Sequence, residues 1–205
     1  MCIRDRFSDA RIAWNTVSVV DPLFTLPLLI IMVIAVMKRS HRFAAFGVAY
    51  ALGYLGLGAV QEDRALAAAR ILAESRGHAP VQLGVKPSFG NLIVWKSVYQ
   101  NGDRYYVDAV RVAAEPQVYV GVSAAKLDID QHFPWLESNS QQALDVTRFA
   151  WFSNQHLGLD PHNPNRIIDI RYSLIPNQIT GMWGITLDPS AGPASHVVWL
   201  SLIHI

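Results

Sequence analysis

Cysteine is nearly absent from this chain of 205 residues, with Cys2 as its only example. A lone thiol makes no intrachain disulfide, and cysteine-based metal sites need several thiols. The chain also lacks an excess of charge of either sign, since its formal net charge is +1 and only 16% of its residues are charged. Binding to nucleic acid therefore has no electrostatic support, and we expect no nucleic-acid partner.

Self-sufficient catalytic motifs are missing as well. The sequence contains no His-Glu-x-x-His pair, no phosphate-binding glycine loop, no Gly-x-Ser-x-Gly turn and no Cys-x-x-Cys pair. The histidines before the last six residues are scattered without the spacing of metal ligands: His41, His78, His132, His156, His162 and His196. We therefore assign no metal ligand in this chain.

Two long apolar runs are present near the start. Residues 21–37 carry no charge after Asp21, and a second apolar run covers residues 43–60. A helix needs about 20 residues to cross a hydrocarbon core of about 30 Å. Two such runs joined by a short basic turn predict a transmembrane helical hairpin over residues 17–60, with the lipid bilayer as its partner.

The turn between the runs carries Lys38, Arg39 and Arg42 and no acid. Because short basic loops stay in the cytoplasm, this predicts a bacterial inner-membrane protein whose C-terminal domain is extracytoplasmic. Small residues such as Gly53 and Gly56 indicate a helix-packing face, against the first span or an upstream helix of the same protein. Asp21, at the start of a span, is the single catalytic candidate. The following Pro22 favours the alternative, a helix N-cap.

Residues 61–78 have a helical composition ended by Gly77, and we interpret them as a helical stalk. Residues 79–199 predict a soluble α+β domain. Two strands flank Asn101-Gly102, as in a β-hairpin, and further strands are expected at 81–85, 116–122, 166–173, 182–187 and 196–199. A capping box at Ser138 and Gln141 predicts one packed helix through about Asn154. The fold class is thus α+β: a transmembrane hairpin, a stalk and a mostly antiparallel β domain.

A polar and aromatic constellation accompanies the predicted hairpin. A loop of Pro, Gly and Asn leads into it, and Lys86 and Arg111 could receive an anionic group there. The alternative is an exposed sheet face with paired charges and tyrosines, and the sequence leaves both open. The candidate ligand-binding residues are Lys86, Asn91, Trp95, Tyr105, Tyr106, Arg111, Asp169, Arg171 and Tyr172, with Lys96 and Asp108 in the same stretch.

Several long blocks resemble one family, the bacterial membrane-bound, metal-dependent hydrolases of the YdjM/YbcI type, also described as LexA-binding, inner-membrane-associated hydrolases. The likeness runs from Phe7 to about Trp199, over the blocks FSDARIAWNTVSVVDPLFTLPLL, AYALGYLGLGAVQ, VKPSFGNLIVWKSVY, RYYVDAVRV, RFAWFSNQHLGLDP, RIIDIRYSLIPN and MWGITLDP. The resemblance implies a divalent metal in the full-length protein. Its ligands would lie in helices before the Phe-Ser-Asp block, where this chain begins, so none is carried over and the chain is interpreted as an N-terminally truncated fragment.

Two functions follow as hypotheses. The first is the C-terminal part of an integral-membrane, metal-dependent hydrolase, whose catalytic residues are unknown apart from the candidate Asp21. The second is a non-catalytic envelope module that binds a lipid headgroup, a glycan or a protein. Residues 1–16 form an N-terminal flank, and residues 1–6 and 200–205 resemble adapter-derived sequence, so both ends are left out of the fold prediction.

Overall fold

The computed structural model describes residues 15–18, 20–80 and 82–201. In these residues the helices are α1 (Pro22–Met37), α2 (His41–Ser75), α3 (Ile129–His132) and α4 (Gln141–Phe152). The strands are β1 (Leu83–Pro87), β2 (Val94–Asn101), β3 (Arg104–Val112), β4 (Pro116–Tyr119), β5 (Ser123–Ala125), β6 (Leu157–Asp160), β7 (Asn163–Asp169), β8 (Trp183–Thr186) and β9 (Val198–Ser201). The predicted α+β class is confirmed.

The strands form two antiparallel sheets, where the sequence suggested one. Sheet A has the order β1-β2-β3-β4, with β5 also paired to β3, and sheet B has the order β6-β7-β8-β9. The two sheets meet through a shared core of Val98, Tyr105, Val107, Ala124, Ile168, Ile170 and Ile179. On the opposite face of sheet B, α4 packs through Val146 and Phe149. Each sheet therefore has one helix on its outer face and the other sheet on its inner face.

The predicted hairpin is present as β2 and β3. Asn101 pairs with Arg104, so the loop consists of Gly102 and Asp103. Gly102 has a φ of +62°, which suits a glycine at the first loop position of a type II′ turn. The pairing in this hairpin determines which β2 side chains face α2 and which face sheet B. Trp95 and Tyr99 lie on the α2 side, whereas Lys96 and Val98 face sheet B.

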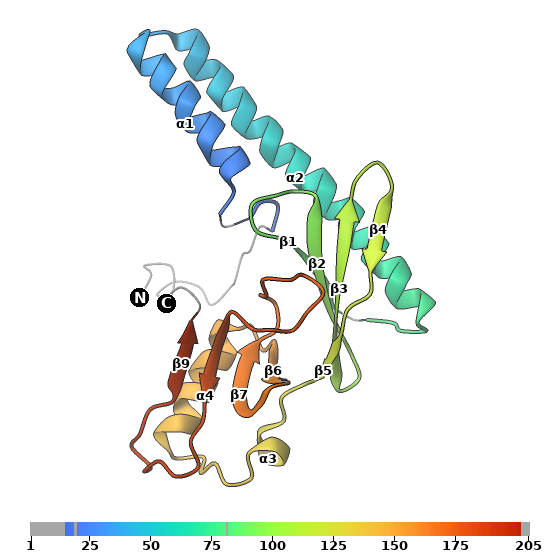
Figure 1. Cartoon of the computed structure of the whole chain (residues 1–205), viewed down its shortest axis with the longest axis vertical. Helices are drawn as coiled ribbons and strands as arrows, with labels where there is room; N and C mark the ends of the chain where they lie inside the picture. Colours follow the sequence, from blue (N-terminus) through green and yellow to red (C-terminus); the bar gives the residue numbers. More distant parts are fainter. Residues whose placement is uncertain (1–14, 19, 81, 202–205) are drawn as a thin grey trace.

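Helices α1 and α2 lie side by side and project beyond the sheets (Figure 1). Asp21 is the N-cap of α1, because its carboxylate accepts from the backbone N–H groups of Leu23 and Phe24. Of the described helices, only α2 is long and apolar enough to cross a membrane. With 16 residues, about 24 Å, α1 falls short of the length predicted for a span.

The second half of α2 is not a free stalk. Ala65, Ala69 and Ala73 recur every fourth residue and are buried, two of them in a cluster with Trp95 and Val110 of sheet A. Small side chains in one row let the helix lie close to the sheet. The predicted stalk is thus the continuation of one 35-residue helix and part of the core.

Smaller differences concern element ends. Ser140, not Ser138, caps α4, because its hydroxyl accepts from the N–H of Ala143. Leu200 and Ser201, left out of the predicted fold, extend β9 and pair with Gly184 and Trp183 of β8. Strands β5 and β6 and helix α3 had no predicted counterpart in the sequence.

Candidate functional site

A pocket of about 530 Å³ lies where the chain enters α1; we call it the α1 pocket. Three segments supply most of its lining: residues 15, 17, 18 and 20 before α1, residues 86–89 at the end of β1, and residues 171–173, 176, 182 and 183 between the end of β7 and the start of β8. Gly90 fixes two of these segments together, because its N–H donates to the carbonyl of Val20 (3.0 Å). The α1 pocket therefore lies where the N-terminal end of α1 meets both sheets.

The walls of the α1 pocket are mainly apolar. Side chains from all three segments and from the end of α4 contribute: Val17, Val20, Phe89, Phe152, Met182 and Trp183. Apolar walls with a few convergent polar groups are typical of small-molecule sites, where the polar groups fix the orientation of the ligand. The α1 pocket suits a ligand with an apolar part.

The charged side chains that line the pocket are all cationic. The ammonium of Lys86 donates to the hydroxyl of Tyr172 (2.9 Å) and lies 4.5 Å from the centre of its ring. The guanidinium of Arg171 lies 5.3 Å from the same ring. Tyr172 thus holds two cations close together by cation–π attraction. An anion bound beside both cations would offset their mutual repulsion.

The two cations differ in their partners. Arg171 donates to both carboxylate oxygens of Asp169, which is fully buried, and its shortest contact is 2.6 Å. That guanidinium charge is largely compensated within the fold. Among the described residues, no carboxylate lies within ion-pairing distance of Lys86. Lys86 is therefore the pocket cation most available to a bound anion.

Lys96 is the third cation of the α1 pocket and is 4% exposed. It stands directly opposite Lys86 in the β1–β2 pairing and points toward sheet B. Its ammonium donates to the hydroxyl of Ser173 (2.7 Å) and to the carbonyl of Gln178 (2.9 Å). Burial lowers the pKa of Lys96 to about 7, opposed by the charge of Asp169.

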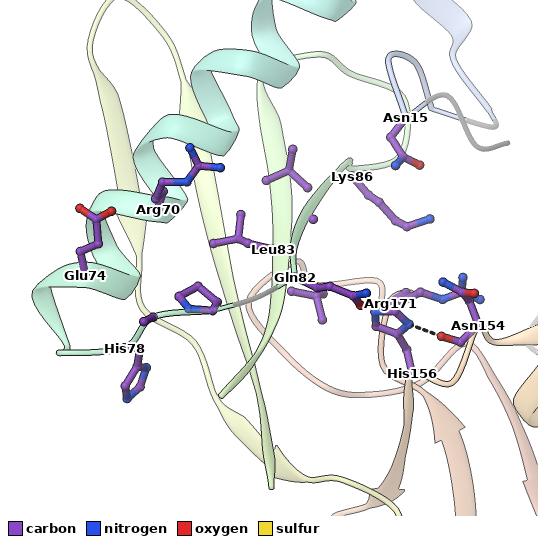
Figure 2. A pocket seen from close by; sticks show the side chains of 15 residues that line it. Asn15, Arg70, Glu74, His78, Gln82, Leu83, Lys86, Asn154, His156 and Arg171 are labelled. Atoms are coloured by element: carbon purple, nitrogen blue, oxygen red, sulfur yellow. Dashed lines mark hydrogen bonds between the residues drawn. The ribbon is translucent and has the colours of Figure 1, made fainter. Parts of the chain in front are cut away.

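A second pocket of about 860 Å³, the α2 pocket, lies beside the end of α2 (Figure 2). Figure 2 shows Arg70 and Glu74 of α2 on one side and Asn154, His156 and Arg171 on the other. Burial lowers the pKa of His156, whose ring hydrogen-bonds the carbonyl of Asn154 (2.7 Å). Because Lys86 and Arg171 line both pockets, they lie on the wall between them.

The predicted site residues separate into two groups. Lys86, Asp169, Arg171 and Tyr172 come together at the α1 pocket, as described above. Asp21 caps α1 and accepts a hydrogen bond from the hydroxyl of Tyr54 (2.7 Å), so a structural role accounts for it.

The other predicted residues lie elsewhere. Trp95 and Tyr105 are core residues, with their polar atoms bonded to the carbonyls of Leu92 and Gln155. Asn91 accepts from two backbone N–H groups of its own loop.

Tyr106 and Arg111 lie on β3, away from the α1 pocket. Tyr106 stacks on Tyr99 near His78, next to the ion pair of Arg76 with Asp108. Arg111 is exposed on β3 and lines neither pocket. Alternation along β3 explains the position of Tyr106, because Tyr106 and Asp108 face α2, whereas the pocket lies on the sheet B side.

Ser173 was not predicted as a functional residue. The sequence only placed it at the end of the strand expected at 166–173. It is 77 residues from Lys96, and only the pairing of the two sheets brings them together. One signal was available: Lys96 lies between Trp95 and Ser97 in the buried centre of β2. A buried lysine needs a specific polar partner, so its position indicates that such a partner exists.

Among the described residues, no group of three His, Cys, Asp or Glu side chains could hold a metal ion. The nearest approach to such chemistry is a pair, Asp145 with His196 (2.8 Å). The metal that the family resemblance implies therefore has no ligand set in this part of the chain, and it stays a prediction about sequence upstream.

Comparisons with protein-family models, curated proteins and solved structures found no match to this chain. The resemblance drawn from the sequence blocks thus stays a prediction.

Proposed function

We propose that this protein is a membrane-anchored domain that binds an anionic amphiphile, such as a lipid with a negatively charged headgroup, in the α1 pocket. The anchor is the α1–α2 hairpin. Its apolar side chains are largely uncovered by protein, including Leu26, Ile30, Val36, Phe46 and Leu52. Large uncovered apolar surfaces are costly in water and suit contact with lipid.

The position of the pocket supports a ligand drawn from the membrane. Ser18 and Val20 line the pocket and lie within three residues of Asp21, the cap of α1. If α1 and the first half of α2 lie in lipid, the pocket opens at the border between lipid and water. An amphiphile could then keep its apolar part near the bilayer while its headgroup reaches Lys86.

The observation that carries this proposal is the Lys86–Tyr172–Arg171 arrangement over an apolar cavity. A lysine without a carboxylate partner, beside a second cation on one tyrosine ring, favours an anion, and the apolar walls favour an attached chain. A glycan would make less use of such walls. The proposal thus selects the lipid-headgroup form of the envelope-module hypothesis.

The orientation of the protein in the membrane is part of the same proposal. The turn of the hairpin carries Lys38, Arg39 and Arg42, so the positive-inside rule favours a cytoplasmic turn and an extracytoplasmic domain at the bacterial inner membrane. The metal-dependent hydrolase is a compatible role for a longer protein. Its metal ligands would come from helices upstream of Phe7, and none of the contacts described above supports them.

Binding of dansyl-undecanoate, a fluorescent fatty acid with an anionic head and an apolar tail, tests the proposal. The protein is placed in nanodiscs of zwitterionic phosphatidylcholine, and Kd is measured from dansyl fluorescence. Lys86→Gln should raise Kd at least about tenfold, because a hydrogen bond to a charged group contributes about 1.5–3 kcal/mol.

Arg111→Gln is the matched control, since it removes one cation from the same sheet outside both pockets. Its Kd should equal that of the unchanged protein. Equal weakening by both variants would mean that general surface charge attracts the probe, and an unchanged Kd in Lys86→Gln would refute the α1 pocket as the site.

A further inference from the structure

Lys96 and Ser173 form the closest polar pair inside the α1 pocket, and neither has a part in holding the anion as described above. They come from different sheets, Lys96 from the middle of β2 and Ser173 from the segment after β7. Nζ of Lys96 and Oγ of Ser173 are 2.7 Å apart. Both residues line the pocket.

Ser173 is held in place by close backbone packing. It forms a β-bridge with Gly181. A side chain at Gly181 would lie 2.7 Å from Cβ of Ile168, so this approach requires glycine. The Ser173 hydroxyl donates to the carbonyl of Ile175 (2.7 Å) while it accepts from the Lys96 ammonium. Once Lys96 is unprotonated, its nitrogen lone pair offers the same hydroxyl a second acceptor.

The surroundings of Lys96 favour the unprotonated amine near neutral pH. Burial lowers the pKa of Lys96 to about 7, against the opposing charge of Asp169. Lys86 faces it from β1, and Arg171 and Tyr172 precede Ser173 on the other side. Asp169 is engaged by Arg171, so it compensates the Lys96 ammonium incompletely. A base with a pKa near the working pH is well suited to accept a proton from a nucleophile.

We propose that Ser173 and Lys96 are a nucleophile and general base that cleave a carboxylic ester of an anionic amphiphile bound in the α1 pocket. This inference rests on the proposed function, because that ligand supplies the ester. Serine–lysine pairs are a known variant of nucleophile activation in which the amine replaces a histidine.

The chemistry takes two steps. Lys96 accepts the hydroxyl proton as Oγ of Ser173 bonds to the carbonyl carbon of the ester, and the bond from that carbon to the alcohol oxygen breaks. The Lys96 ammonium then protonates the departing alkoxide, which leaves an acyl-serine. A water molecule next gives a proton to Lys96 and bonds to the acyl carbon, and Ser173 leaves and regains its proton. The sum is ester plus water giving acid plus alcohol.

A fluorophosphonate probe tests the pair in the full chain reconstituted in nanodiscs. An activated serine displaces fluoride from this probe and stays covalently labelled. The expected result is label on Ser173, located by mass spectrometry of its peptide. Its rate should rise as the pH passes upward through about 7, because only unprotonated Lys96 accepts the proton.

Variants separate a catalytic role from a structural one. Ser173→Ala and Lys96→Met should each lower labelling at least 100-fold, and Lys96→Arg should do the same because arginine stays protonated. Ser97→Ala is the control and should label normally, since Ser97 is a buried serine on β2 whose hydroxyl bonds to the carbonyl of Asp108. Label on Ser173 that persists in Lys96→Met would overturn the pair.

The unchanged protein decides the question even if a variant fails to fold. No label on Ser173 in the folded protein, or a rate independent of pH between 6 and 9, would overturn the inference. Binding of dansyl-undecanoate to the same preparation separates the two proposals. Binding without label refutes the nucleophile alone, and label without binding refutes the anionic-amphiphile pocket while the pair stands.

Discussion

At the scale of single residues, the buried charges of this protein differ in their partners. Asp108 accepts two hydrogen bonds from Arg76 (both 2.7 Å) and one from the N–H of Gly121 (2.9 Å). Lys96 has only neutral hydrogen-bond partners, Ser173 and the carbonyl of Gln178. A compensated pair suits a structural role, whereas an incompletely compensated amine in a pocket suits ligand binding or proton transfer.

Asp108→Ala should therefore destabilise the fold strongly. The change leaves the Arg76 guanidinium without its carboxylate at the end of α2, and loss of one partner of a buried pair costs about 3–5 kcal/mol. Denaturant unfolding in detergent measures the change in the free energy of unfolding. The matched control is Asp160→Ala, because the Asp160–Arg166 pair is more exposed, with 12% exposure for Asp160 against 1% for Asp108. That control should cost under about 1 kcal/mol, and similar losses in both variants would contradict the assignment.

At the scale of elements, the position of the segment before α1 depends on one glycine of α2. A side chain at Gly58 would lie 2.2 Å from the carbonyl oxygen of Thr16, on the segment that leads into α1 and lines the α1 pocket. Gly56, half a turn earlier, has no atom within 4 Å of the same position. Close contact with the segment before α1 therefore requires glycine at position 58, whereas the same contact gives no reason for glycine at position 56.

Gly58→Ala should lower the free energy of unfolding by about 1–3 kcal/mol, as overpacking does. Gly56→Ala should leave it unchanged or raise it by up to about 1 kcal/mol, because alanine favours helix. Thermal unfolding in detergent compares the two. If both substitutions behaved alike, the segment before α1 would not lie against α2 as described.

The elements also show how far the sequence could predict the structure. The β2–β3 hairpin and α4 were predictable from local signals: Asn101-Gly102 between β-rich runs, and a serine cap before an apolar face. The division into two sheets was not, because it depends on contacts such as Val98 with the Ile168–Ile170 region, about 70 residues apart in sequence. The same long-range packing places Ser173 beside Lys96, so only half of that pair drew attention in the sequence.

At the scale of the whole molecule, the long helix α2 links the apolar hairpin to the core of sheet A. The first half of α2 runs beside α1 with its apolar side chains uncovered, and the second half is built into the core of sheet A (Figure 1). The α1 pocket lies where these two parts meet. The proposed binding of an anionic amphiphile, and the chemistry of Ser173 on it, both require lipid around the first half of α2.

Cysteine accessibility along α2 tests this requirement most directly. In a Cys2→Ser background, Leu52→Cys and Ile71→Cys place one thiol on each half of the helix, at positions with nearly equal exposure in the structure, 65% and 67%. After reconstitution in liposomes, a water-soluble maleimide should modify the thiol at position 71 and spare the thiol at position 52, because only the latter is covered by lipid. Dissolving the liposomes in detergent and then denaturant should expose both. Equally fast modification of both thiols in intact liposomes would contradict the account.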